Sequence, residues 1–338
     1  MNLAKIAELA NVSKSAVSIA LNGKPGVSEA TRAEILRIAR ETGYVQRPRQ
    51  LASTAKTIRI LAVVEGNIVN ADFSRSPFFV ELVDCIQKAT ELAGYACVVS
   101  TVPLQDARSE LARIEGALPS AGFLLLGTNL AGDQVTELCR AGRASVVVDT
   151  LDELLPVNMV VMNNRQGALL AADHLVGLGH RRIGLGRCTT RISNFRAREQ
   201  GFMEGLANHG LVLGPESVLP LPPSIEGSQA IFSQYISERR AELPTALFCE
   251  NDYMAIGVVK ALVGAGIRVP AEVSVVGFDD IGEASVVTPE LTTVHVAKDQ
   301  IARFAVERLL AIMTADAGMP TKQIIDVDLV VRQSTIAI

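Results

Sequence analysis

The chain has 338 residues, of which 49% are hydrophobic and 20% are charged, and this composition favours a globular protein. That length exceeds what one hydrophobic core usually fills, so we expect two or three domains. No apolar run approaches the roughly 20 residues that span a bilayer, and the N-terminus lacks the basic head and apolar stretch of a signal peptide. These features predict a cytoplasmic protein.

The net charge of −4 is unevenly distributed along the chain. Residues 1–60 carry ten Lys and Arg against four Glu, a surplus of +6, whereas the remaining residues carry −10. A small basic segment on a large acidic body predicts that this segment alone meets a polyanion.

Cysteine usage gives no sign of a metal or redox centre. The cysteines occur singly inside apolar stretches, without a Cys-x-x-Cys pair or a nearby histidine cluster. They are Cys85, Cys97, Cys139, Cys188 and Cys249. This pattern predicts buried free thiols, with neither a metal nor a cofactor.

The first 45 residues read as three helices. Apolar residues recur at helical spacing over residues 3–10, and Ser13 is placed to cap a second helix. Ser28 is placed to cap a third helix that ends near Gly43. The apolar stripe of this third helix is predicted to be Ile35, Leu36, Ile38 and Ala39.

From Ile58 onward, short β-branched runs alternate with stretches of helical length. The expected strands are residues 58–64, 96–100, 122–127 and 145–149, and then, after a loop, 157–162, 181–186, 245–250 and 273–280. The expected helices are residues 79–93, 107–118, 133–141, 165–178, 194–209, 228–239, 252–264 and 301–313. Two such runs predict an α/β core of two doubly wound parallel-sheet subdomains with a cleft between them.

We therefore expect a small all-α head over residues 1–45, a hinge or linker over 46–57 and a core over 58–338. The first subdomain of the core is expected to span about 58–160 plus a segment near 290–320. The second is expected to span about 161–289 plus the C-terminal strand, so that the chain crosses back between them.

The second predicted helix has a face without acidic side chains. Its outward residues are Ser13, Lys14, Ser15, Ser18, Ile19 and Asn22. Short polar groups and a lysine suit a surface that enters a major groove beside phosphates, where a carboxylate would be repelled. The alternative is a small helical cap with an ordinary solvated face.

The wider pattern resembles the LacI/GalR family of bacterial repressors. The matching segments are "NVSKSAVSIALNG" and "VSEATRAEILRIARETGY" in the head, then "GHRRIG", "FRAREQGF", "CENDYMAIG", "VSVVGFDD" and "PELTTV" in the core. The resemblance implies a helix-turn-helix head followed by a periplasmic-binding-protein-like core. It implies a homodimeric, sequence-specific transcriptional regulator, a repressor, that binds double-stranded operator DNA under the control of a small-molecule effector, a sugar or a sugar derivative.

The resemblance also assigns roles to the head residues. Lys14, Ser15 and Ile19 fall where relatives read bases, and Ser13, Ser18 and Asn22 fall where relatives hold phosphates. Ile19 replaces a frequent arginine, so it can touch a thymine methyl but cannot form a bidentate contact with guanine. In the linker, Leu51 is the candidate for a side chain that wedges into the minor groove; the alternative there is a basic flexible linker.

Candidate effector residues lie where predicted strands end. In doubly wound sheets, ligands bind at the carboxyl ends of the strands. The residues at these ends or on the helices that follow, which the resemblance also assigns to effector contact, are Phe78, Phe79, Asp149, Asn194, Arg198, Asn251 and Asp279. An arginine fork among carboxylates and amides suits vicinal sugar hydroxyls, and the two phenylalanines offer an apolar wall.

Each of these residues has a structural alternative. A strand-end Asp often caps a helix or turn, and Arg198 can pair with Glu199 or Glu204 at the surface. The family often has Asp-Asn at Asn163 and Asn164, and Val296 stands where some members present a polar contact. The absence of Trp also leaves a nucleobase or another small polar metabolite open as the effector.

Two other classes of protein are disfavoured by the sequence. A solute-binding protein of a transport system shares this core, but residues 1–50 and the lack of a signal peptide disfavour it. An enzyme is disfavoured because no nucleophile elbow, phosphate loop, dinucleotide fingerprint or metal-ligand spacing occurs in the sequence.

Overall fold

The computed structural model describes residues 7, 9–10, 12–13, 16–17, 20, 27–41, 57–64, 76–140, 144–314 and 318–338. The chain divides into two compact units, Met1–Ala55 and Lys56–Ile338. Of the head residues assigned to DNA contact, only Ser13 lies within the described residues; Lys14, Ser15, Ser18, Ile19, Asn22 and Leu51 lie outside them.

The described part of the head is a small helical unit with its own core. Helix α3 (Glu29–Glu41) packs its apolar face against residues from the preceding segment. The buried members of this core are Ala7, Val17, Ala20, Ile35, Ile38 and Ala39. Leu36, which we also predicted in the stripe, is only half-buried.

Both predicted caps in the head are present. Ser13 Oγ accepts a hydrogen bond from the backbone N–H of Ala16 at 3.1 Å, and Ser28 Oγ accepts one from Thr31 at 3.1 Å. Each bond satisfies a backbone donor at the start of a helix that the helix itself cannot pair. Arg32 on α3 donates to the carbonyl of Ala20 at 2.9 Å, which ties the third helix to the second.

The first sheet of the larger unit contains six strands in the order β11-β5-β4-β3-β1-β2, and all neighbours are parallel. Its strands are β1 (Thr57–Val64), β2 (Ala96–Pro103), β3 (Gly122–Leu126), β4 (Ala144–Val148), β5 (Met159–Met162) and β11 (Lys322–Ile325). The helices α4 (Pro77–Leu92) and α11 (Lys298–Thr314) pack together on it, and α5 (Ala107–Ala117) and α6 (Gly132–Cys139) form a second pair. A short 3-10 turn, η2 (Leu104–Asp106), precedes α5.

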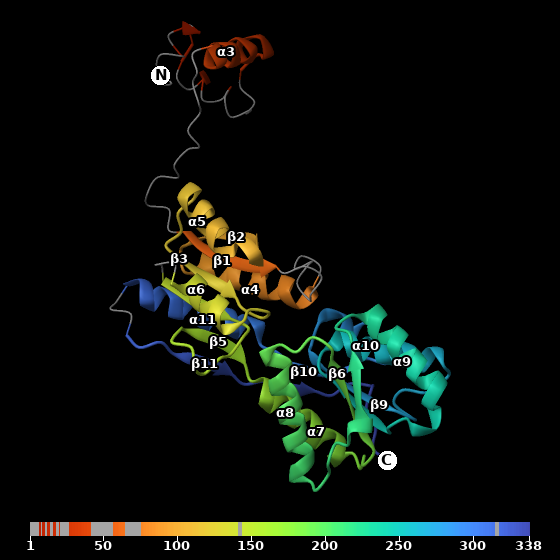
Figure 1. Ribbon diagram of the computed structural model, residues 1–338. Coiled ribbons are helices and arrows are strands. Elements are labelled where there is room, and N and C mark those ends of the chain that lie inside the picture. The colour runs from red at the N-terminus through yellow and green to blue at the C-terminus, as the bar shows by residue number, and fades with distance from the viewer. Residues whose placement is uncertain are drawn as a thin grey trace. The chain divides into compact units, whose positions relative to one another are not determined.

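The second sheet has the order β12-β10-β9-β8-β6-β7, parallel except for the antiparallel edge strand β12. Its strands are β6 (Ile183–Cys188), β7 (Val218–Leu221), β8 (Ala246–Cys249), β9 (Ser274–Asp279), β10 (Thr292–His295) and β12 (Asp328–Val330). Helices α7 (Asn164–Gly177) and α8 (Ser193–Asn208) pack as one pair, and α9 (Ile225–Arg239) and α10 (Asp252–Gly264) as another (Figure 1). Among the described residues, this half also contains the 3-10 turns η3 (Pro215–Ser217), η4 (Arg240–Glu242) and η5 (Gly282–Ser285).

This architecture confirms the predicted α/β core of two doubly wound sheets. Strands β1, β3, β8 and β9 are almost wholly buried because helices cover both faces of the sheets, which is why they read as nearly continuous apolar runs in the sequence. Strand β2, at the edge of the first sheet, is mostly exposed or half-buried. Strands β7 and β10 were not among the predicted strands, and the single C-terminal strand expected in the second subdomain is two strands, β11 in the first sheet and β12 in the second.

The chain passes between the sheets at more points than the sequence suggested. We expected residues 157–162 to begin the second α/β run, but β5 lies in the first sheet, between β4 and β11. We also expected the segment near 290–320 to belong to the first subdomain; α11 does pack on the first sheet, whereas β10 lies in the second. The physical reason is that a buried parallel strand has the same pattern in either sheet, so its sequence does not specify its neighbours.

Within the described residues, the chain crosses after β5, after β10 and after β11. Two of these crossings are tied together, since Asn163 Nδ2 donates to Asp326 Oδ1 at 3.0 Å and the N–H of Val327 donates to Gln166 Oε1 at 3.1 Å. Hydrogen bonds between crossings predict that the halves move about a defined hinge.

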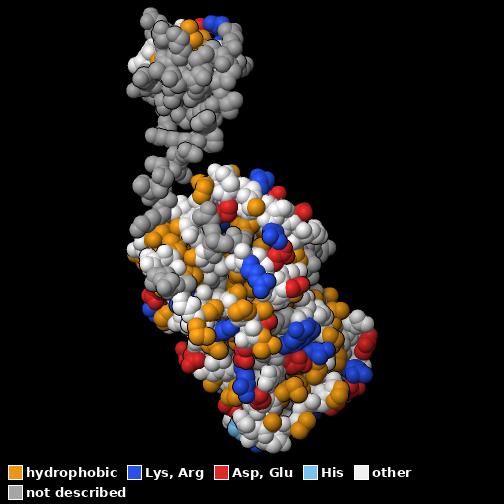
Figure 2. Space-filling model, turned by 60° about the vertical axis from the view of Figure 1, so that its left-hand side comes forward, with side chains coloured by type: hydrophobic (Ala, Val, Ile, Leu, Met, Phe, Trp, Pro, Cys, Tyr) orange, Lys and Arg blue, Asp and Glu red, His pale blue; other side chains and the backbone are white. Residues whose placement is uncertain are grey.

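The surface of the Lys56–Ile338 unit carries no single dominant charge on the face in view in Figure 2. There, basic and acidic side chains are interspersed with apolar ones. On this face the larger unit lacks the one-signed field that attracts a polyanion.

Candidate functional site

Arg198 lies at the centre of a buried polar cluster at the junction of the two sheets. It projects from α8 with 3% of its surface exposed. Its Nε donates to Asn164 Oδ1 at 2.8 Å, its Nη1 donates to the Glu250 carbonyl at 2.6 Å, and its Nη2 lies 3.0 Å from Asp279 Oδ1. All three nitrogens of the guanidinium group are therefore fixed in direction.

Arg198 does not form the surface ion pair with Glu199 or Glu204 that we considered as the alternative to a site role. Glu199 pairs with Arg191 and Glu204 pairs with Arg165. The Arg198 guanidinium instead lies over the Phe278 ring, 3.7 Å from its centroid, which adds a cation–π contact to the ion pair.

Asp149, directly after β4, is the second anchor of the cluster. Asn194 Nδ2 donates to both its carbonyl and its Oδ1, each at 3.1 Å, and the Thr128 hydroxyl donates to its Oδ2. Because β4 belongs to the first sheet and α8 packs on the second, the Asp149–Asn194 contact joins the two halves.

Left-handed backbone marks two of these strand ends. Asp149 has a φ of 63° and Asp279 has a φ of 114°. Such values are uncommon for residues other than glycine and persist where the surroundings hold them. The side chains that hold Asp149 and Asp279 here are Asn194 and Arg198.

Asn251 serves as a helix cap. Its Oδ1 accepts a hydrogen bond from the backbone N–H of Met254 at 2.9 Å. Asn251 therefore has the capping role that we gave as the structural alternative to ligand contact. The next residue, Asp252, accepts from the Thr293 hydroxyl at 2.5 Å and from the N–H of Ile281 at 3.0 Å. Asn251 thus fixes the start of α10, and Asp252 ties this helix to β10 and to the loop after β9.

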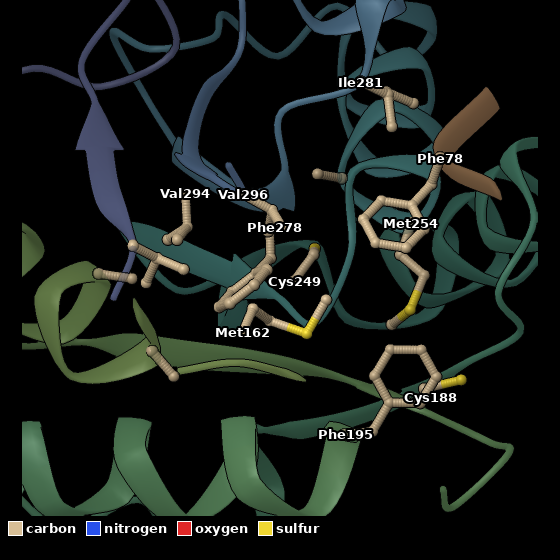
Figure 3. Packing of buried hydrophobic residues seen from close by; sticks show 14 of the residues in the cluster. Phe78, Met162, Cys188, Phe195, Cys249, Met254, Phe278, Ile281, Val294 and Val296 are labelled. Carbon is tan, nitrogen blue, oxygen red and sulfur yellow. The ribbon is translucent and has the colours of Figure 1, made fainter. Parts of the chain in front are cut away.

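The two predicted wall residues, Phe78 and Phe79, are both buried at the start of α4, with ring centroids 5.4 Å apart. In the view of Figure 3, Phe78 lies near Met254, with Phe195 on the far side of that methionine, and all three belong to one hydrophobic cluster. The Tyr253 hydroxyl accepts from the N–H of Phe78 at 3.4 Å, which links α4 to α10. Phe78 therefore lies at the junction, among side chains of the second half.

Burial dominates the electrostatics of the cluster. It raises the pKa of Asp149 to about 7, although the Thr128 hydrogen bond and the Arg198 charge act in the opposite direction. It also raises the pKa of Asp279, against the charges of Arg198 and Lys298. Burial raises the pKa of Glu250 to about 7, with Arg191 lowering it. Asp149 and Glu250 therefore change charge near neutral pH, and burial disfavours the ionised form of all three carboxyl groups.

The cluster is closely packed in this conformation. Asp149, Arg198 and Asp279 are 2%, 3% and 7% exposed. Two surface hollows of about 500 and 350 Å³ occur in the first half of the core, beside α5 and α6, and none of the predicted effector residues lines them. The three side chains are therefore almost fully covered by the surrounding chain in this conformation.

Sequence reasoning missed several members of the cluster. Asn164 was noted only as a departure from the family, yet it is the acceptor for Arg198. Glu250 and Lys298 were not singled out; Glu250 directly follows the apolar run of β8, whereas Lys298 lies between Ala297 and Asp299 without such a signal. Thr128 follows β3 and gave no comparable signal.

No group of three or more His, Cys, Asp or Glu side chains that could hold a metal occurs among the described residues. In the same part of the chain, no helix is long and apolar enough to cross a membrane. The cysteines are free; Cys188 and Cys249 are buried and the others are half-buried.

A capped helical head followed by two doubly wound sheets, with a polar cluster at their junction, is the architecture of a ligand-responsive DNA-binding regulator. Comparison with known proteins agrees. Residues 2–46 match the family model "Bacterial regulatory proteins, lacI family", and residues 172–335 match "Periplasmic binding protein-like domain".

Curated relatives align over nearly the full length. The HTH-type transcriptional repressor PurR of Haemophilus influenzae (strain Rd) is 27% identical over 334 residues, 97% of each chain. The HTH-type transcriptional repressor CytR of Escherichia coli (strain K12) is 28% identical over 335 residues, 98% of this chain and 96% of that relative. A solved structure described as the transcriptional regulator CelR–cellobiose complex is 25% identical, covers 99% of both chains and has a TM-score of 0.73.

The chain thus combines a LacI-family helix-turn-helix domain with a periplasmic-binding-protein-like domain, the domain pair of LacI-family transcriptional regulators. It is a DNA-binding transcriptional regulator under effector control and not an enzyme, like the repressors to which it aligns.

Proposed function

We propose that this protein is a homodimeric repressor whose operator affinity is set by an uncharged sugar, or sugar derivative, bound at the Arg198 cluster. The observation that carries the effector proposal is the convergence of Arg198 from α8 with Asp149 and Asp279, which lie at the ends of strands from the two sheets. A ligand that contacts Asp149 on one side and Asp279 on the other bridges the two halves, and so it has different affinities for the open and closed forms.

The chemistry of the cluster favours a neutral polyhydroxylated effector. Carboxylates and a fixed guanidinium group are the partners that sugar hydroxyls use. Burial already disfavours the ionised forms of Asp149, Asp279 and Glu250, so a phosphorylated or carboxylated ligand is disfavoured because it would add negative charge beside these groups in a buried site. The cellobiose bound by CelR belongs to the class proposed here.

The polar cluster is proposed to bind the sugar through Asp149, Asn194, Arg198 and Asp279, with Phe78 as the apolar wall. Asn251 and Phe79 are proposed as supports, since the first caps α10 and the second lies in the main core. The aromatic and sulfur side chains near Phe78 also fit a nucleobase ring, which makes a nucleoside the second candidate.

For DNA, we propose that Lys14, Ser15 and Ile19 contact bases, that Ser13, Ser18 and Asn22 contact phosphates, and that Leu51 enters the minor groove. The +6 surplus within residues 1–60 supports this assignment. Two identical heads fit a pseudo-palindromic operator because twofold protein symmetry calls for twofold DNA. A cytoplasmic location is also proposed, because a protein that binds operator DNA must be in the same compartment as that DNA.

Two experiments test the proposal. A thermal-shift panel of cellobiose, maltose, D-ribose, D-glucose, adenosine and glucose 6-phosphate should show a rise in Tm that grows with concentration for a neutral sugar and not for the phosphorylated one. A duplex selected by the protein from a random pool should bind with an affinity that falls steeply as salt rises. A Tm raised only by glucose 6-phosphate, or DNA binding that ignores salt, would contradict the proposal.

A further inference from the structure

Lys298 is a buried cation at the junction that the proposed function does not use. It is the first residue of α11, directly after the crossing that follows β10, and it is 6% exposed. A buried lysine is costly unless polar groups surround its ammonium group. Its partners therefore indicate what it holds in place.

Those partners come from both halves of the core. Lys298 Nζ lies 2.9 Å from Glu81 Oε2 on α4, which packs on the first sheet. It donates to the carbonyl of Asp279 at 3.2 Å and lies 3.5 Å from that of Asp280, both at the end of β9 in the second sheet. One ammonium group thus connects a helix of one half to a strand end of the other.

The strand end that Lys298 contacts has an unfavourable backbone. Asp279 and Asp280 are consecutive residues with positive φ, 114° and 49°. Such a pair persists only if surrounding groups over-determine it. The side chain of Asp280 is held by His295 at 2.8 Å and by Arg332 at 2.6 Å, and the two carbonyls are held by Lys298.

Lys298 also lies next to the proposed effector wall. Its Nζ is 5.4 Å from the centroid of the Phe78 ring, one turn before Glu81 on α4. Asp279, whose carbonyl accepts from Lys298, pairs through its carboxylate with Arg198. Any separation of Phe78 from Asp279 must stretch the contacts of Lys298 with Glu81 or with the strand end.

From these contacts we infer that Lys298 is a positioning residue for the effector response. It fastens the N-terminal part of α4, through Glu81, to the end of β9, stabilises the closed junction and transmits effector occupancy to the first half of the core. This inference rests on the proposed function for its biological meaning, but the fastening itself is a property of the junction and can be tested without an effector.

The effector-free test is hydrogen–deuterium exchange of the full-length protein and its Lys298→Met and Glu81→Gln variants. Methionine keeps the length of the side chain and removes the charge. Peptides covering α4 should exchange at least about threefold faster in both variants, while peptides covering α7 should not change. The double variant should exchange no faster than Lys298→Met alone, because both changes remove the same contact.

The matched control is Lys88→Met. Lys88 lies on the same helix α4 and pairs with Asp84 at 2.6 Å, but its side chain is 69% exposed. Exposed pairs of this kind contribute little, so α4 should exchange as in the wild type. Equal exchange of α4 in wild type and Lys298→Met would overturn the inference, as would equal acceleration across the entire core.

The second test uses the probe from the sugar panel that raises Tm most. Operator affinity is measured with and without it for wild type, Lys298→Met and Lys88→Met. The factor by which the probe changes operator affinity should be at least about fivefold smaller in Lys298→Met than in the wild type, and it should be unchanged in Lys88→Met. A wild type that ignores every sugar contradicts the proposed function, whereas a responsive wild type with an equally responsive Lys298→Met contradicts the role of Lys298.

Discussion

Arg198 and Asp279 form a buried ion pair, with Nη2 3.0 Å from Oδ1, that connects α8 to the end of β9. The arginine also contacts Asn164, the carbonyl of Glu250 and the ring of Phe278. Truncating a buried arginine with this many partners lowers stability, because each partner is left buried without its hydrogen bond or its opposite charge. Arg198 therefore supports the junction in addition to its proposed contact with the effector.

The first prediction follows from this double role. Arg198→Ala should lower the free energy of unfolding by about 3–5 kcal/mol, since it leaves Asp279 and Asn164 buried without their donor. Arg196→Ala is the control, because Arg196 lies on the same helix and is exposed. Chemical denaturation measures both; similar losses for the two variants would show that the Arg198 network carries little stability.

The close packing of α7 against α8 gives the second prediction. A Cβ added to Gly201 on α8 would lie 2.0 Å from the Arg165 carbonyl oxygen on α7, and the backbone of a packed helix cannot shift far enough to relieve this clash. Gly201→Ala should therefore destabilise the core by about 1–3 kcal/mol or more. Gly177→Ala, at the end of α7 with nothing within 4 Å of the added Cβ, should instead be neutral or stabilising by up to about 1 kcal/mol. Thermal melts that rank the two variants in the opposite order would refute this packing.

The third prediction concerns pH. Burial raises the pKa of Glu250 from 4.5 to about 7, so the folded state holds its proton more tightly than the unfolded state does. The stability that this group contributes is therefore fully present below about pH 4.5 and is lost as pH rises through 7. Relative to Glu250→Gln, the wild type should lose on the order of 3 kcal/mol between pH 4.5 and 7.5.

Denaturation curves of both proteins at pH 4.5, 6 and 7.5 measure that difference. Glu238→Gln, an exposed change on α9, serves as the control and should follow the wild type at every pH. A difference between wild type and Glu250→Gln that stays constant with pH would mean that Glu250 is ionised throughout the range.

The fourth prediction concerns the head. Ser28 caps α3 through Thr31, so Ser28→Ala should cost about 1 kcal/mol of local stability, whereas Ser28→Asn should retain most of it. Exchange of the backbone amides of α3 in the full-length protein reports this local stability. Indistinguishable exchange in the alanine and asparagine variants would argue against the cap.

Much of the fold follows from the sequence because buried parallel strands and capped helices have strong local patterns. The helices predicted at 252–264 and 107–118 match α10 and α5 to within one residue. The membership of β5 and β10 in their sheets could not be predicted, since pairing with β11 and β12 is set by contacts with the distant C-terminus.

Part of the site could be predicted because the ends of the predicted strands are visible in the sequence. The strand ends placed Asp149, Arg198 and Asp279 near one another, and the structure joins them through Asn194 and direct ion pairing. Asn251 is a helix cap, a role that residue type alone does not distinguish from ligand contact. Lys298 escaped notice because its partners, on α4 and β9, are distant in sequence.

The most direct test of effector control is the operator affinity of wild type and Asp279→Asn, with and without the sugar that raises Tm. Asparagine keeps the shape of the side chain but removes the charge that pairs with Arg198 and is proposed to face the sugar. We predict that the sugar changes wild-type operator affinity by at least about fivefold and leaves Asp279→Asn unchanged, with equal DNA binding by both proteins in its absence. An equal response of the two proteins to the sugar would contradict the account.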